Sequence, residues 1–271
     1  MLYKEWHKYS NGYFNFERKF VNNSKISKMQ CWINKVAVIT DCGDEVGFTI
    51  MEQLAKVGMI VIGFNKNEDS LELVTEKFKT LIANKISGKI VLYNCDITDI
   101  KQLETAFEKI KDTYEGVDVL INNAYCNIDC LVNTGQLKDF RDIIDTNIYA
   151  LVACTRLAAG SMIERKTRGH IININDLCSY QIPIESKKTV FIAAKAAITS
   201  VNEILRHEFR YLKVNIKVTN IACGSIESLS ETVLSDSRLR IRDVAKLVKL
   251  ILNTPEQLQV HEWQTNRLVD K

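Results

Sequence analysis

Short apolar segments alternate with amphipathic ones from residue 35 almost to the end of the chain. The apolar segments are residues 35–40, 59–64, 89–94, 117–121, 170–175, 216–221 and 258–263. The intervening segments, residues 46–58, 68–85, 101–114, 137–164, 191–212 and 242–253, have the character of amphipathic helices. Continuous apolar strands separated by helices are typical of a parallel sheet that is covered on both faces. The pattern therefore predicts an α/β fold with one doubly wound parallel sheet, which binds ligands at the carboxyl ends of its strands.

The composition fits a single globular domain. Of the 271 residues, 46% are hydrophobic and 25% are charged. No run of 18 or more residues is wholly apolar, so we expect no membrane span. The eight cysteines are scattered and no secretory signal is visible, which favours free thiols in a cytoplasmic protein. Cys126 and Cys130 have no second cysteine pair or histidine cluster near them, so we expect no metal site.

Residues 1–28 differ from the rest of the chain in charge. They hold six Lys/Arg and two Asp/Glu, a net charge of +4, whereas the remainder holds 30 against 31, a net charge of −1. We expect residues 1–28 to be a disordered extension and residues 29–271 to be the folded domain. The seven aromatic side chains of the extension leave a docking segment as the alternative. The nearly neutral body gives no electrostatic reason to expect a nucleic acid partner.

Six short motifs follow the apolar segments in a fixed order. They are D-C-G-D-E-V-G at 41–47, C-D-I-T at 95–98, N-N-A-Y at 122–125, D-T-N at 145–147, I-N-I-N-D at 172–176 and I-A-C-G at 221–224. In this order they resemble the short-chain dehydrogenase/reductase family over about residues 29–271. N-T-P at 253–255 and V-H at 260–261 are similar to the animal cytosolic branch that contains "member 11" and insect farnesol-dehydrogenase-like proteins.

The resemblance implies a Rossmann-type domain that uses NADP(H) to interconvert alcohols and carbonyl compounds. It also implies homo-oligomers, or hetero-oligomers with family relatives, formed through the helices at residues 137–164 and 191–212. The segment between Gly224 and Asp243 normally covers the substrate in this family. Only eighteen residues separate these two positions, fewer than the branch usually has, which argues against a complete substrate pocket.

The resemblance identifies four catalytic positions. Phe191 and Lys195 are four residues apart, which places both side chains on one helix face, where the family has Tyr-x-x-x-Lys. Asp176 stands where the family has the serine that polarises the substrate carbonyl. Asn147 and Lys195 match the residues that hold a proton-relay water and the nicotinamide ribose.

Two of these positions have lost the chemistry that the family needs. Phe191 has no proton to donate, and an ionised Asp176 only accepts hydrogen bonds. General acid catalysis contributes about 10²–10⁴-fold and one electrostatic donor about 10²–10³-fold, so the loss of both predicts a pseudoenzyme. The alternative is an active NADP(H)-dependent oxidoreductase of a small or lipophilic alcohol or carbonyl compound, with another proton donor such as Tyr180.

The turn after the first strand carries acids where the family has phosphate-binding glycines. By the resemblance, Asp41 and Glu45 replace the first two glycines, and Gly47 retains the third. An ionised carboxylate about 5 Å from a phosphate charge costs roughly 3 kcal/mol at an effective dielectric constant near 20. We therefore predict that the acids occupy the positive end of the helix and that dinucleotide binds weakly. The alternative is an outward shift of the loop that accommodates the cofactor.

The other cofactor positions are better retained. Lys195 and five further residues match those that the family places around adenine, ribose and nicotinamide: Thr40, Asp96, Ile97, Asn123 and Ala124. Lys66 follows the second strand, where NAD-preferring sites usually have an acid, so any cofactor is expected to be NADP(H). Tyr125 replaces the glycine of the family's N-N-A-G motif and is expected to crowd the nicotinamide pocket.

Overall fold

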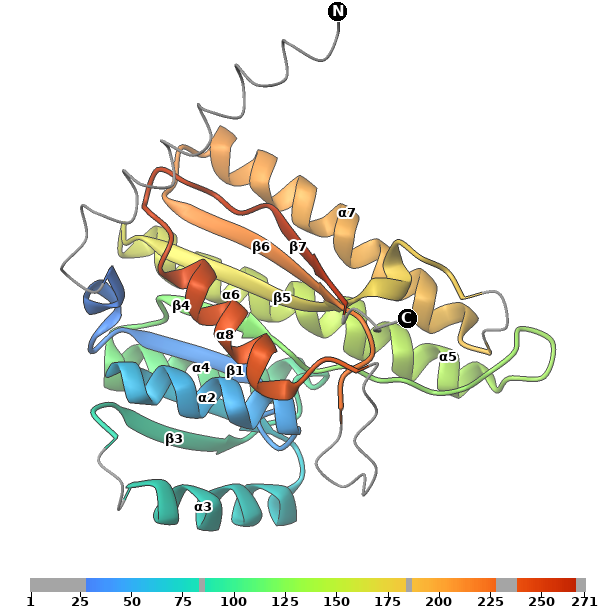
Figure 1. Cartoon of the computed structure of the whole chain (residues 1–271), viewed down its shortest axis with the longest axis horizontal. Coiled ribbons are helices and arrows are strands. Elements are labelled where there is room, and N and C mark those ends of the chain that lie inside the picture. Colours follow the sequence, from blue (N-terminus) through green and yellow to red (C-terminus); the bar gives the residue numbers. More distant parts are fainter. Residues whose placement is uncertain (1–27, 83–85, 184–186, 228–237, 267–271) are drawn as a thin grey trace, which may run out of the picture.

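The computed structural model describes residues 28–82, 86–183, 187–227 and 238–266 (Figure 1). The extension predicted at residues 1–28 lies outside these ranges except for its last residue. Part of the shortened segment after Gly224 also lies outside them.

One parallel sheet of seven strands organises the chain, as the sequence predicts. The strands are β1 (Val36–Thr40), β2 (Ile60–Asn65), β3 (Lys89–Asn94), β4 (Val119–Asn122), β5 (Gly169–Asp176), β6 (Ile216–Cys223) and β7 (Glu262–Thr265). Their spatial order is β3-β2-β1-β4-β5-β6-β7, and every pairing is parallel. The order reverses between β1 and β4, which makes the carboxyl ends of these two strands the topological switch point.

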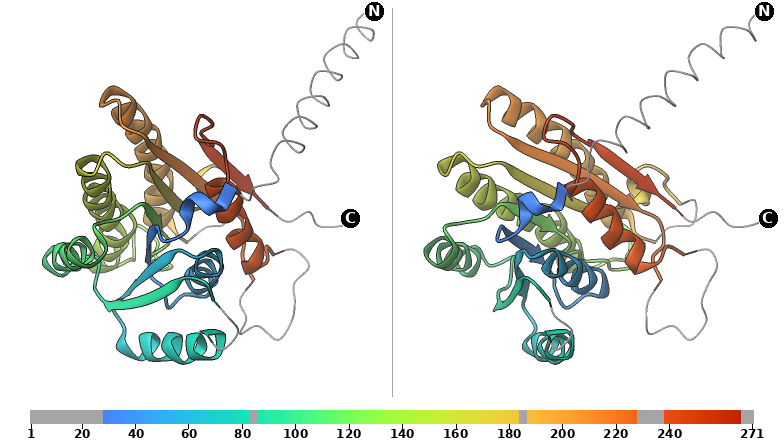
Figure 2. Two further views of the ribbon diagram at one scale, coloured as in Figure 1. Left: turned by 90° about the vertical axis from the view of Figure 1, so that its left-hand side faces the viewer. Right: turned by 60° about the vertical axis from the view of Figure 1, so that its left-hand side comes forward.

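Helices cover both faces of the sheet (Figure 2). The helices are α2 (Glu45–Val57), α3 (Glu68–Ile82), α4 (Ile100–Tyr114), α5 (Leu137–Ile144), α6 (Leu151–Glu164), α7 (Thr189–Tyr211) and α8 (Ile241–Leu252). Alternate residues of β1 point to opposite faces, as the strand period of two requires. Ala37 and Ile39 join the core under α2 and α8, whereas Val36 and Val38 join the core under α4 and α6. These two cores fill the space between the helices and the two faces of the sheet. Ligands are therefore expected at the carboxyl edge of the sheet.

The segment 137–164 is not the single regular helix that the sequence predicts. Between α5 and α6 the backbone widens into a π-helical turn, η2 (Asp145–Ala150). The Asn147 side chain donates to the Ile143 carbonyl at 2.8 Å, four residues earlier, and so competes with the regular α-helical ladder. Single π turns inside helices are frequent at functional sites.

The last strand is shorter and later than the predicted 258–263. The Thr219 hydroxyl donates to the Val260 carbonyl, and the Asn220 amide of β6 donates to the His261 carbonyl. The regular ladder with β6 begins only at Glu262. Residues 260–261 thus bond to β6 through one side-chain and one backbone donor before the regular strand begins.

Candidate nucleotide and catalytic site

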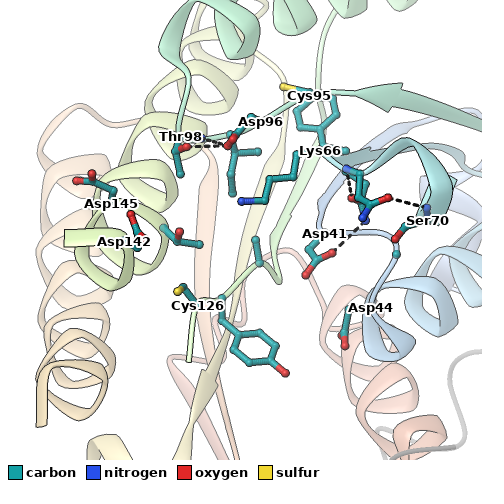
Figure 3. A pocket seen from close by; sticks show the side chains of 18 of the residues that line it. Asp41, Asp44, Lys66, Ser70, Cys95, Asp96, Thr98, Cys126, Asp142 and Asp145 are labelled. Carbon is teal, nitrogen blue, oxygen red and sulfur yellow. Dashed lines mark hydrogen bonds between the residues drawn. The ribbon is translucent and has the colours of Figure 1, made fainter. Parts of the chain in front are cut away.

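Two clefts meet at the carboxyl edge of the sheet. The first, of about 800 Å³, lies beyond the ends of β1, β2 and β3 and contains Asp41 and Lys66 (Figure 3). The second, of about 570 Å³, lies beyond β5 and β6 beside the start of α7. Asp44 and Tyr125 line both clefts. The two form one continuous surface of the kind that a dinucleotide occupies, with Tyr125 between the halves.

The turn between β1 and α2 keeps a glycine-like backbone despite its acids. Asp41 has a φ of 54°, in the left-handed region that glycine normally supplies. Asp44 caps α2, because its carboxylate accepts from the Val46 amide at 3.1 Å. A Cβ on Gly47 would lie 2.4 Å from the Asp41 carbonyl oxygen, so this position tolerates no side chain without movement of the turn. As predicted, an acid of the turn occupies the positive end of the helix itself.

The surroundings of Asp41 disfavour the ionised form of its carboxyl group. Burial raises the pKa of its carboxyl to about 6, and the nearby Asp44 charge adds to this shift. The Asp44 backbone amide and the Lys66 ammonium act in the opposite direction. The Asn65 amide donates to Asp41 Oδ1 at 3.2 Å, which fixes the carboxyl beside the cleft. Figure 3 shows Asp41 and Asp44 on one side of the first cleft.

Thr40 joins the two strands that diverge at the switch point. Its buried hydroxyl accepts from the backbone amides of Asn123 and Ala124, both at 3.0 Å. The Asn123 side chain in turn donates to the Asp41 carbonyl at 3.2 Å. Thr40, Asn123 and Ala124, which are predicted around the cofactor, are thus joined by hydrogen bonds to one another and to the turn between β1 and α2, called the phosphate turn below.

The residues predicted around adenine and the cation predicted beside them line the first cleft together. Asp96 Oδ1 accepts from the Thr98 amide at 2.9 Å and from its hydroxyl at 2.7 Å, which shapes the loop after β3. Ile97 lines the cleft as an apolar wall, and Lys66 lines it as an exposed cation. These residues are placed together as the sequence predicts.

Sequence reasoning missed the opposite wall of this cleft. Asp142 of α5 and Asp145 of η2 line it, across from the turn (Figure 3). Their spacing of three residues on a helix was visible in the sequence as a shared face. Together with Asp41, Asp44 and Asp96 they make a cleft that has five aspartates and two lysines, Lys66 and Lys138.

The catalytic wall of the second cleft brings together three of the predicted residues. Asp176 ends β5, while Phe191 and Lys195 lie on one face of α7, and all three line the cleft. The Lys195 ammonium lies 5.5 Å from the ring centroids of both Phe191 and Tyr125. Burial lowers the Lys195 pKa to about 8, and the ring faces are placed for cation–π contact with the ammonium. The Asp176 carboxylate opposes this shift, and its Oδ1 accepts from the Cys178 amide at 2.7 Å.

Asn147 lies farther from this wall. Its side-chain amide donates to the carbonyls of Cys126 and Ile143, both at 2.8 Å, and its oxygen accepts from the Cys126 amide at 3.3 Å. It is buried and lines neither of the two clefts. Its side chain therefore anchors the loop that carries Tyr125.

Tyr180 is turned away from the second cleft. Its hydroxyl accepts from Thr199 and Asn220, both at 3.1 Å, and is hydrogen-bonded to Glu262 of β7. Burial and the Glu262 bond raise the pKa of the phenol. Tyr180 thus ties the loop after β5 to the edge of the sheet. This arrangement argues against the idea that it replaces the missing acid.

The residues that the structure describes show neither a metal-binding cluster nor a membrane-spanning helix. No group of three or more His, Cys, Asp or Glu side chains is placed there to hold a metal ion. In the same ranges, no helix combines the length and apolarity needed to cross a bilayer. All eight cysteines are free, and five of them are buried.

Known proteins share this architecture along most of their length. A sequence profile of the short chain dehydrogenase family matches residues 35–238. The chain is 31% identical to a farnesol dehydrogenase of Aedes aegypti, over 86% of this chain and 96% of that protein. It is 30% identical to dehydrogenase/reductase SDR family member 11 of Gallus gallus, over 87% and 97% of the two chains.

Solved structures agree on the fold. An alcohol dehydrogenase from Thermococcus sibiricus, complexed with 5-hydroxy-NADP, has a TM-score of 0.76 at 16% identity, over 88% of this chain and 98% of that chain. A metagenomic short-chain oxidoreductase in complex with NADP has a TM-score of 0.74 at 21% identity, over 88% and 99%. The sheet order, the clefts at its switch point and the profile match along the chain lead to one conclusion: the protein belongs to the short-chain dehydrogenase family.

Proposed function

We propose that this protein is a pseudoenzyme of the short-chain dehydrogenase/reductase family, with the fold and the substrate-facing lysine but without ordinary alcohol or carbonyl turnover. The observation that carries the proposal is the pair of side chains beside Lys195. Phe191 and Asp176 line the same cleft as the ammonium, and neither carries the hydroxyl group that the family uses there. This supports the assignment of positions 176 and 191 as degenerate catalytic sites.

Electrostatics in the second cleft also disfavour hydride transfer. Reduction of a carbonyl group builds negative charge on its oxygen, which a short-chain dehydrogenase stabilises with a hydroxyl donor. An ionised Asp176 repels that charge. Loss of the acid and the donor together predicts a rate lower by about 10⁴–10⁷-fold, if the two effects are independent.

Any cofactor is proposed to be NADP(H), bound weakly. The two solved relatives described above carry NADP or its 5-hydroxy form, and Lys66 supplies a cation beside the adenosine subsite. Asp41 and Asp44, however, lie where the pyrophosphate would approach α2. The cofactor therefore gains its usual contacts at the adenosine end and meets repulsion at its centre.

Association is the proposed mode of action of such a chain. Tyr149 and Val152 are exposed apolar side chains beside α6, with exposed fractions of 54% and 43%. They support an oligomer, formed with itself or with a family relative in the cytoplasm. Sedimentation of the purified chain, alone and mixed with an active relative, tests this; monomers in both samples would refute it.

An active oxidoreductase is the second candidate, and the position of the Tyr125 phenol favours it. This phenol lines both clefts, and its ring lies 5.5 Å from the Lys195 ammonium. Its pKa is raised by burial and by Asp44, Asp41 and Asp176, which is unfavourable for a group that must exchange its proton.

One experiment separates the two candidates. NADPH oxidation is followed with a panel of aldehydes and ketones, with farnesol tested in the reverse direction, at saturating cofactor. The wild type, Asp176→Ser/Phe191→Tyr and Tyr125→Phe are compared. We expect an inactive wild type and a gain of at least about 100-fold in the double variant. Family-like activity in the wild type would overturn the pseudoenzyme, and its loss in Tyr125→Phe would establish the second candidate.

A further inference from the structure

Lys195 has an environment that suits a reaction other than hydride transfer. Its side chain is 4% exposed, yet it lines the second cleft, where a ligand can reach it. The rings of Phe191 and Tyr125 hold the amine between them at 5.5 Å. A buried lysine that a ligand can reach from a cleft is a suitable setting for a nucleophilic amine.

We propose that Lys195 forms a covalent imine with an uncharged, apolar aldehyde that enters the second cleft. The amine nitrogen bonds to the carbonyl carbon, and the carbonyl oxygen takes up the two protons that the nitrogen loses. That oxygen leaves as water, so no oxidant or reductant is consumed. The proposal rests on the proposed function in one respect: Phe191 leaves the lysine without the phenol that would otherwise share its proton.

The fraction of neutral amine is favourable at physiological pH. Burial is the largest cause that lowers the pKa of Lys195, to about 8. At pH 7.5 about a quarter of such an amine is neutral, against about a thousandth for an ordinary lysine. The titratable groups that face it are Asp176 of β5, Cys178 of the following turn, Cys223 of β6 and the Tyr125 phenol, and the first three act to retain the proton. Phe191 and Tyr125 also contribute ring faces.

The lining of the cleft selects the class of aldehyde. Ile174, Ile226 and Ile241 give it apolar walls, whereas Asp44, Asp176 and Glu227 give it negative charge. With four acids, Asp44, Glu45, Asp176 and Glu227, against Lys188 and Lys195, the lining disfavours carboxylate- and phosphate-bearing carbonyl compounds. A volume of about 570 Å³ lies within the range of small-molecule pockets. A medium-chain aliphatic aldehyde fits both requirements.

Lys217 provides a matched control within the same chain. It is also 4% exposed, and burial also lowers its pKa to about 8. Its ammonium, however, donates to the carbonyls of Pro255 and Leu258, both at 2.6 Å, and it lines neither of the two clefts. If a lowered pKa alone decided reactivity, the two lysines would react equally. If access from the cleft decides it, only Lys195 reacts.

The test traps the imine by reduction. The full chain, free of nicotinamide, is incubated with limiting octanal and cyanoborohydride at pH 7.5, and the alkylated lysines are located by peptide mass spectrometry. We expect at least about tenfold more alkylation at Lys195 than at Lys217 or at the average exposed lysine. Lys195→Arg abolishes the dominant adduct, and Lys217→Arg leaves it unchanged. Pyridoxal phosphate, an anionic aldehyde, shows no preference for Lys195.

Equal alkylation of Lys195 and Lys217, or uniform alkylation of exposed lysines, would overturn the proposal. The peptide map of the wild type decides this even if a variant fails to fold. Because the assay contains no nicotinamide, its result is independent of any oxidoreductase activity. If the wild type has oxidoreductase activity and forms no Lys195 adduct, both the proposed function and the imine proposal are wrong. If the wild type is inactive and forms no adduct, only the imine proposal is wrong.

Discussion

The phosphate turn and the catalytic wall depart from their family in opposite ways. The turn has a glycine-like geometry but an acidic charge: Asp41 adopts a left-handed backbone, and Gly47 permits the close approach of the Asp41 carbonyl. The catalytic wall holds a buried cation without a phenol at position 191: the Lys195 ammonium lies 5.5 Å from the Phe191 ring. Under the proposed function, the turn therefore differs from an active relative in its charge, and the wall differs in its proton donors.

In both regions burial also disfavours the charged form of an ionisable side chain. Burial raises the pKa of Asp41 to about 6 and lowers that of Lys195 to about 8. We therefore expect removal of the turn's carboxylates to strengthen cofactor binding, whereas activity at the wall requires the introduction of proton donors.

The largest expected effect is on cofactor affinity. Asp41→Gly/Asp44→Ser removes both carboxylates, supplies a residue suited to the left-handed backbone and keeps a helix cap at position 44. Relief of a single charge pair at about 5 Å is worth about 3 kcal/mol, or roughly 100-fold in Kd for NADPH. Fluorescence titration measures this.

Asp142→Asn is the matched control, because it removes one charge from the opposite wall of the same cleft. We expect a smaller gain there than in the turn. Equal gains would mean that the overall charge of the cleft, rather than the turn, limits binding. A wild-type Kd already in the low micromolar range would contradict the comparison itself.

The geometry of the turn is tested by Gly47→Ala. The new Cβ would meet the Asp41 carbonyl oxygen at 2.4 Å, so we expect a loss of about 2–3 kcal/mol in the free energy of unfolding. Gly160→Ala in α6 is the control, since a Cβ there meets no atom within 4 Å. It should stabilise the protein by about 0.5–1 kcal/mol. Urea denaturation of both variants measures the contrast; a neutral Gly47→Ala would show that the turn yields.

The charge of the turn is tested by the pH dependence of Asp41→Asn. Burial raises the folded-state pKa of Asp41 from its ordinary value of 3.8 to about 6, so the folded state binds the proton more tightly. Ionisation therefore weakens the fold between pH 4 and 6, and the penalty is complete above pH 6. Asn should stabilise the protein by about 2 kcal/mol at pH 8 and have little effect at pH 4. Denaturation curves at the two pH values that give the same difference would rule out this strain.

The sequence predicts the regions of regular structure well and the sites less completely. The segment at 36–39 is apolar throughout, which predicts a strand that is buried on both faces of the sheet. The π turn at Asn147 depends on a side-chain bond to Ile143 that no periodicity reveals. The role of Tyr180 was open because a loop residue has no fixed direction, and its hydroxyl proves to be bonded to Asn220 of β6. Substitutions are visible in a sequence, whereas the groups that fill the vacated space require coordinates.

The smallest expected effect comes from Phe191→Tyr, and its matched control is Phe209→Tyr on the same helix. Both rings are 3% exposed, but Phe191 lines the second cleft, whereas Phe209 packs in the core between α7 and the sheet. A hydroxyl that reaches the cleft stays solvated, so we expect Phe191→Tyr to cost less than about 1 kcal/mol. The same hydroxyl in the closed core lacks a partner and should cost about 2–3 kcal/mol. If urea denaturation shows equal costs, the space for a phenol at position 191 has been filled, and restoring the tyrosine alone cannot restore the catalytic wall.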